Sequence, residues 1–156
     1  MTMLHFRLTI IYILAFSAFA YSQQQPKASS TNKSTSTEAT FPAKSSPAYA
    51  EILLKKTELQ ADLESLILEY TEEYPKVLEI RFTLGLIQKE SEKMIAMKPA
   101  ETLKLTLALG KLMVRKFELE TDMWGLQRNY KDDHPDVKRA KRKVEIYESA
   151  IREILG

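Results

Sequence analysis

The chain repeats part of itself at a spacing of 60 residues, and this repeat restricts the possible folds more than any other feature of the sequence. Between residues 56–77 and 116–137, eight of the 22 aligned positions are identical. A repeat of this length indicates one supersecondary unit that occurs twice. The identical pairs are Lys56/Lys116, Glu58/Glu118, Leu59/Leu119, Asp62/Asp122, Leu66/Leu126, Tyr70/Tyr130, Pro75/Pro135 and Val77/Val137.

Large apolar residues recur in steps of three and four within each copy, interrupted at matching places by Lys56 and Lys116. This spacing keeps one narrow face of a helix apolar, as in the seam of a coiled coil, whereas a strand would need a period of two. Four glycines and six prolines are too few for the turns of an all-β fold, and the absence of cysteine excludes a disulfide scaffold. We therefore expect an all-α protein.

Prolines mark where the helices begin. Tyr74-Pro75 and His134-Pro135 each place an extended residue before a proline that suits the first turn of a helix. Each break is compatible with a kinked rod, but reversal of the chain is favoured because it buries the seam of one arm on the other. We expect helices at 47–72, 75–97, 99–132 and 135–155, the third extending about 50 Å at ~1.5 Å per residue.

These helices predict two tandem antiparallel helical hairpins, repeat 1 at 47–98 and repeat 2 at 99–156. Apolar residues outside the seams, including Leu53, Leu54 and Trp124, would stay exposed in isolated hairpins and need further cover. Two arrangements provide that cover. The hairpins pack on each other as an elongated four-helix bundle with Trp124 between them, or coiled-coil chains pair into a homo-oligomer.

The N-terminal part has the pattern of a targeting segment followed by a linker. A nearly unbroken apolar run at 8–20 predicts a signal peptide over 1–20, although cleavage after Ser22 and an uncleaved membrane anchor are alternatives. The run is shorter than the ~20 residues of a membrane-spanning helix. Half of the residues in 27–46 are Ser or Thr, which predicts a disordered linker over 21–46. We expect a periplasmic or secreted protein with no stable membrane span.

A longer pattern surrounds both prolines. Leu66-x3-Tyr70-x3-Tyr74-Pro75-x-Val77 is repeated from Leu126, with His134 in place of the second tyrosine. These segments resemble the Leu-x3-Tyr-x3-His-Pro-x-Val element in the periplasmic coiled coils of bacterial polysaccharide co-polymerases, the chain-length determinant family. The resemblance covers neither the transmembrane helices nor the kinase domain of that family. It implies a break or turn in a helical arm, with these residues at the hairpin tips: Tyr70, Tyr74, Pro75, Val77, Tyr130, His134, Pro135 and Val137.

Catalytic chemistry has little support in the sequence. His134 is the only histidine beyond the predicted signal peptide, and no serine is placed to form a triad with it. Asp132, Asp133 and Asp136 surround it and are suitable ligands for a divalent cation, so a metal-binding protein or enzyme centred on His134 is a further alternative. Acidic residues also suit the start of a helix at Pro135. We expect no catalytic residue, no metal site and no cofactor.

The densest run of charge follows the second proline. The whole chain has 23 basic and 21 acidic residues, a balance that does not indicate a nucleic-acid-binding protein. A solvated helix face is one interpretation of the run. The other is contact with an anionic polysaccharide or an envelope protein, made by Lys138, Arg139, Lys141, Arg142 and Lys143.

Together these features predict a non-catalytic scaffold or partner-binding module of the cell envelope, linked to polysaccharide export. The alternative is a periplasmic chaperone or stress-binding protein whose additional apolar side chains hold unfolded clients.

Overall fold

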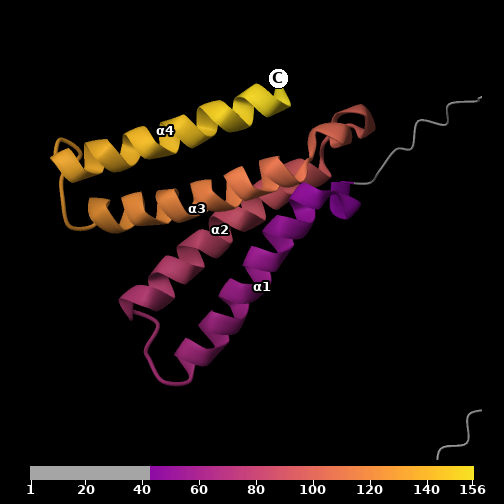
Figure 1. The fold of residues 1–156 in the computed structure, drawn as a ribbon. Coiled ribbons are helices and arrows are strands. Elements are labelled where there is room, and N and C mark those ends of the chain that lie inside the picture. The colour runs from indigo at the N-terminus through magenta and orange to yellow at the C-terminus, as the bar shows by residue number, and fades with distance from the viewer. Residues whose placement is uncertain (1–42) are drawn as a thin grey trace, which may run out of the picture. The chain divides into compact units, whose positions relative to one another are not determined.

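A computed structural model describes residues 43–156 of the chain. The predicted signal peptide and most of the predicted linker lie outside the described residues. Within residues 43–156 the chain forms helices and no strand, which confirms the all-α prediction. The elements are the 3-10 helices η1 (Ala43–Ser45) and η2 (Pro99–Lys104) and the α-helices α1 (Pro47–Ile67), α2 (Pro75–Ile95), α3 (Leu107–Gln127) and α4 (Pro135–Leu155) (Figure 1).

The α-helices repeat with the same period as the sequence. Each has 21 residues, and the bounds of α3 and α4 are those of α1 and α2 shifted by 60 positions. The caps repeat too. The hydroxyl oxygen of Ser46 accepts a hydrogen bond from the backbone N–H of Tyr49 at 3.2 Å, and that of Thr106 accepts one from Leu109 at 3.3 Å. Such caps satisfy a backbone donor that the first turn of a helix leaves unpaired.

The predicted helix over 99–132 is wrong, because the chain leaves helical geometry at Leu105, between η2 and α3. The backbone of Leu105 has a ψ of 59°, its side chain is only 1% exposed, and its carbonyl oxygen accepts a hydrogen bond from Ala48 N at 3.2 Å. This residue is therefore held against the start of α1. Pro99 opens the short η2, and Thr106 caps the longer α3.

α1 and α3 both end five residues before their predicted ends at 72 and 132. After α1, the backbone N–H groups of Glu69 and Tyr70 both donate to the carbonyl oxygen of Leu66 at 3.1 and 2.9 Å. The corresponding bonds after α3 run from Asn129 and Tyr130 to Leu126 at 3.0 and 2.9 Å. The matching pattern shows that both copies turn by the same local geometry. α2 ends at Ile95, close to its predicted end.

The chain reverses direction between α1 and α2, and again between α3 and α4, so that each helix packs against the next (Figure 1). We call these the α1–α2 pair and the α3–α4 pair. α3 also packs against α1 and α2. The core therefore takes residues from both pairs and from the segment before α1, where Ala43 and Ser46 are buried although the sequence assigned them to the linker. Its members are Ala43, Ala48, Ile52, Ile87, Met94, Leu105, Leu109, Met113 and Phe117.

Candidate functional site

The two reversals, residues 68–74 (the first turn) and 128–134 (the second turn), place the predicted tip residues in matching positions. Tyr70 stacks on Tyr74 with 4.2 Å between the ring centroids, and Tyr130 stacks on His134 at the same separation. The prolines begin α2 and α4. Val77 and Val137 are fully buried. The valines therefore belong to the packing below the turns, while the stacked rings lie at the surface.

Each turn is also tied to the following helix by one ion pair. Glu72 binds Arg81 at 2.9 Å, and Asp132 binds Lys141 at 3.1 Å, at positions 60 residues later. The hydrogen bond and the charge of Arg81 hold the pKa of Glu72 below its ordinary value. Hydrogen bonds from Gln127 and Lys141, with the charge of Lys141, lower the pKa of Asp132 in the same way. Lys141 therefore has a partner within the turn, as Arg81 has.

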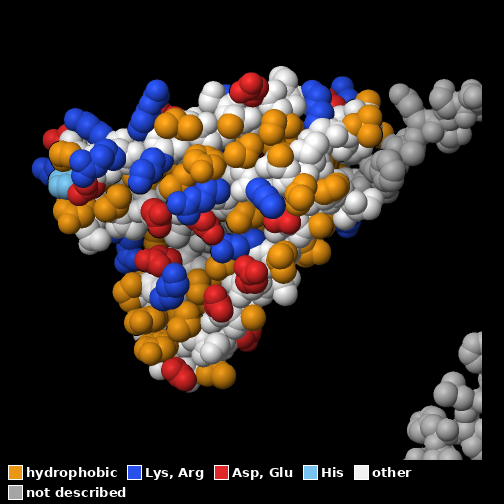
Figure 2. Space-filling model, in the orientation of Figure 1, with side chains coloured by type: hydrophobic (Ala, Val, Ile, Leu, Met, Phe, Trp, Pro, Cys, Tyr) orange, Lys and Arg blue, Asp and Glu red, His pale blue; other side chains and the backbone are white. Residues whose placement is uncertain are grey.

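The other four predicted cations lie on the first turns of α4. Arg139 pairs with Asp136, and Arg142 pairs with Glu145 at 3.0 Å. Lys138 and Lys143 are exposed and form no ion pair within residues 43–156. Figure 2 shows Lys and Arg side chains gathered over the second turn and α4, whereas hydrophobic side chains prevail around the first turn. The copies therefore share a backbone but differ in surface charge.

A groove of about 320 Å³ lies on the surface between α3 and α4, beside these cations. Leu119 and Leu126 of α3 form part of its wall, and Arg139 and Lys143 of α4 line the opposite side. Asp122 and Asp136 also line it, so the groove is not uniformly positive. A partner bound here would meet both cations and apolar surface.

His134 has a structural role at the start of α4. Its Nδ1 atom accepts a hydrogen bond from the backbone N–H of Asp136 at 3.2 Å, in addition to the stacking on Tyr130. Within residues 43–156, no group of three or more histidine or carboxylate side chains is placed to hold a metal ion. The acidic residues around His134 are therefore close in sequence but do not converge on one point.

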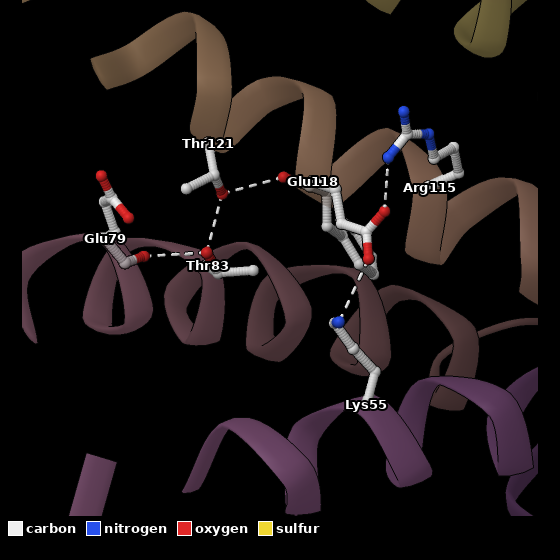
Figure 3. A network of polar contacts seen from close by, with 7 residues as sticks. Lys55, Glu79, Thr83, Arg115, Glu118 and Thr121 are labelled. Carbon is white, nitrogen blue, oxygen red and sulfur yellow. Dashed lines mark hydrogen bonds and ion pairs between the residues drawn. The ribbon is translucent and has the colours of Figure 1, made fainter. Parts of the chain in front are cut away.

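A second polar cluster, which the sequence did not predict, joins the α1–α2 pair to α3 (Figure 3). Glu118 of α3 binds Lys55 of α1 at 3.1 Å and Arg115 of its own helix at 2.8 Å. Burial raises the pKa of Glu118, but the hydrogen bonds and charges of Arg115 and Lys55 outweigh it, so the pKa lies below its ordinary value. Beside this cluster, the hydroxyl groups of Thr83 and Thr121 are 2.7 Å apart.

Aromatic stacking continues the same contact. Trp124 of α3 lies on Phe82 of α2 with 4.8 Å between the centroids, and Arg128 covers the indole at 5.0 Å. The sequence placed Trp124 between the two repeats, and the stacking on Phe82 agrees with that expectation. The threonine pair had no comparable signal, since isolated threonines on helices carry no pattern. The spacing of 60 residues did carry a signal for Thr106, which stands where Ser46 precedes the first helix.

In the described part of the chain, large apolar side chains are exposed on the outer face of α1. Leu53 and Leu54 are about half exposed, and Leu68 just beyond the helix is 86% exposed. The sequence indicated that these side chains needed further cover. Within residues 43–156 the α3–α4 pair does not supply it.

The chain matches no protein-family model, no curated protein and no solved structure. Among residues 43–156, no helix has both the length and the apolar character needed to cross a lipid bilayer.

Proposed function

We propose that this protein is a non-catalytic helical scaffold that binds an anionic partner through the second turn and the start of α4. One observation carries the proposal: within residues 43–156 the two turns share their packing, but only the helix start after the second turn carries cations without an ion-pair partner. Lys138 stands 60 residues after Leu78, which is half-buried. Lys143 stands 60 residues after Thr83, which is buried. A position that packs in one copy is thus an exposed charge in the other.

The electrostatic reasoning is direct. Lys141 duplicates the role of Arg81, and Arg139 and Arg142 have partners on their own helix. Lys138 and Lys143 have no such partner in the described part of the chain, so they keep their full attraction for an external anion. Exposed charges of this kind raise the rate and selectivity of encounter with an opposite charge.

The cellular setting rests on the sequence. The N-terminal apolar run supports export from the cytoplasm, and the resemblance around the two prolines supports a role in the cell envelope linked to polysaccharide export. We propose two tandem antiparallel helical hairpins as the architecture of this scaffold. The repeated caps, turns and ion pairs favour that arrangement, because each helix pair is built from the same contacts.

Replacement of Lys138 and Lys143 by glutamine tests the proposal. We expect the purified variant to bind polygalacturonate, an anionic polysaccharide, about tenfold more weakly, because two charge contacts are lost. The salt dependence of this binding should also be smaller than for wild type. Lys76→Gln is the control because Lys76 lies at the start of α2 beside the first turn. Equal binding by wild type and the double variant, with unchanged melting temperature, would contradict the proposal.

A chaperone function is the second candidate, favoured by the exposed leucines of α1. Exposed apolar side chains on one helix face can hold unfolded chains. In that case the purified protein would suppress aggregation of a denatured client, and Leu53→Ser with Leu54→Ser would remove this activity. If the wild-type protein does not suppress aggregation, the chaperone function is rejected.

A further inference from the structure

We propose that a second copy of this chain binds the cationic face of the α3–α4 pair, using the exposed face of its own α1. In this contact, α1 of the second copy would pack on the α3–α4 pair in the way that α3 packs on the α1–α2 pair within one chain. This inference rests on the proposed function, because it names the anionic partner of the same surface. Its physical basis is the internal repeat. Repeated units that stack in one direction leave the two complementary halves of their interface free at opposite ends.

The face of α3 that meets the α1–α2 pair is well defined. Phe117 and Met113 are buried in the common core, and Gly110 lies against Ala48 of α1. Toward the second turn the same face continues through Thr121 and Trp124, which contact Thr83 and Phe82 of α2. Glu118 at its edge pairs with Lys55.

The equivalent face of α1, 60 residues earlier, is exposed along its whole length. Leu53 and Thr57 occupy the positions of the buried Met113 and Phe117, and both are exposed. Within residues 43–156 no helix covers this face, so half of the interface is present without its complement. Leu54 occupies the position of Val114, which packs against the core, and it is exposed too. The remaining matching positions, all exposed, are Ala50, Glu58, Ala61 and Glu64.

The complementary half lies on the α3–α4 pair. On the α1–α2 pair, the residues that contact α3 include Lys55, Phe82 and Thr83. Their equivalents 60 residues later are Arg115, Arg142 and Lys143, and all three are exposed. The cations that follow the second turn therefore occupy the positions through which the first pair binds α3.

Opposite charges would meet in the repeated contact. The ion pair between Lys55 and Glu118 becomes a pair between Arg115 of one chain and Glu58 of another, with the same signs. The stack of Phe82 on Trp124 becomes a pair between Arg142 and Glu64. Glu58 and Glu64 are the only charged residues among the seven on the exposed α1 face, and both are acidic. This match in sign argues for a second copy over an uncharged partner.

The position of Gly110 predicts that the contact between chains is the weaker one. A Cβ atom added to Gly110 would lie 2.8 Å from the Cα atom of Ala48, so α1 and α3 approach too closely for a side chain there. The exposed face of α1 has Ala50 at that place. The helices of two chains would thus stand farther apart at this end. The contact is heterologous, because different surfaces meet, so association would form rings or open chains and not a two-fold dimer.

Charge exchange across the contact provides the test. Sedimentation velocity in low-salt buffer should show that the wild-type chain self-associates and that added salt reverses the association. The acidic-face variant, Glu58→Arg with Glu64→Arg, should associate at least ~10-fold more weakly, because like charges would face each other. The basic-face variant, Arg115→Glu with Arg142→Glu, should behave in the same way. A mixture of the two variants should associate again, because each then offers the complement of the other.

Glu69→Arg with Glu73→Arg in the first turn adds the same charge outside the proposed contact and should leave self-association unchanged. Circular dichroism melts show whether each variant is folded. Renewed association in the mixture also requires that both variants are folded. A monomeric wild-type chain, or a mixture that stays monomeric, would overturn the inference. Polygalacturonate binding by the acidic-face variant separates the two proposals, since that variant keeps Lys138 and Lys143 and tests self-association alone.

Discussion

Lys116 interrupts the apolar seam, and the structure gives the reason. Its ammonium group bridges Glu120 on α3 at 3.1 Å and Glu148 on α4 at 3.4 Å. Burial lowers the pKa of Lys116, but the surrounding carboxylates outweigh this effect and the pKa lies above its ordinary value. Lys56 donates to Gln88 at 3.2 Å at the matching place. Each interruption of the seam is thus a polar bridge between the two helices of a pair.

Gly110 is required by the close approach of α1 and α3. Gly110→Ala should destabilise the chain by about 1–3 kcal/mol, because the added methyl group would collide with the backbone of Ala48. Gly125 lies in the same helix with open space around it. Gly125→Ala should therefore be neutral or stabilising by up to ~1 kcal/mol, through helix propensity alone. Urea unfolding of both variants measures the difference, and equal free energies would contradict the close contact.

α1 and α3 share one template but differ in burial. α3 packs on α4 through one face and on the α1–α2 pair through another, whereas the second face of α1 remains exposed. The residues follow this difference. Phe117 is 1% exposed in the core, while Thr57 at the equivalent position faces solvent. The different surroundings of the two similar helices therefore explain why Phe117 and Thr57 differ at equivalent positions.

The link between α1 and α3 through Glu118 should depend on pH. Because its pKa is lowered in the folded state, Glu118 contributes stability above its unfolded pKa of ~4.3 and loses it as pH falls through the folded value. The free energy of unfolding of wild type should thus exceed that of Glu118→Gln near pH 7, and the difference should shrink as pH falls below the unfolded value of ~4.3. The side chains are partly exposed, so the difference should stay below ~1 kcal/mol.

Glu58→Gln is the matched control for this measurement. Glu58 occupies the equivalent position in α1 and makes no ion pair within residues 43–156. At protein concentrations low enough to prevent association, comparison with this variant separates the loss of a carboxylate at this helix position from the loss of the Glu118 ion pairs. A constant difference between wild type and Glu118→Gln across this pH range would show that the ion pairs do not stabilise the fold.

The four helices should unfold as one unit because they share one core. The core joins Ile52 of α1, Ile87 of α2 and Phe117 of α3, and Ile151 of α4 packs against it. Trp124 is the only tryptophan and stacks on Phe82 across the contact between the two pairs. Its fluorescence reports separation of the pairs, whereas far-ultraviolet circular dichroism reports loss of helix. The two signals should give coincident transitions.

Phe117→Ala should shift both transitions together and lower the free energy of unfolding by about 3–5 kcal/mol, because it leaves a cavity in the shared core. Thr57→Ala at the equivalent exposed position should change it by less than ~0.5 kcal/mol. If the fluorescence change precedes loss of helix in the wild-type chain, the pairs separate before they unfold and the single-core description is wrong.

Local patterns were enough to predict the helical class, the repeat and three of the helix starts. Spacing in threes and fours depends only on the geometry of one helix, and a proline that lacks an N–H group suits the first turn wherever the chain lies. The stacked pairs Tyr70/Tyr74 and Tyr130/His134 also lie within one turn of chain, so the tip residues could be predicted to act together. The cationic run on α4 was visible for the same reason.

Contacts between distant segments decided the rest. Leu105 leaves the helix because Ala48, far away in the sequence, binds its carbonyl group, and no local pattern records that bond. Glu118, Thr83 and Thr121 meet only when α1, α2 and α3 are packed, so their cluster had no signal in the sequence. Burial differs between the equivalent faces of α1 and α3 for the same reason. A helix can specify which of its faces is apolar, but only the packed neighbours determine which of those faces is covered.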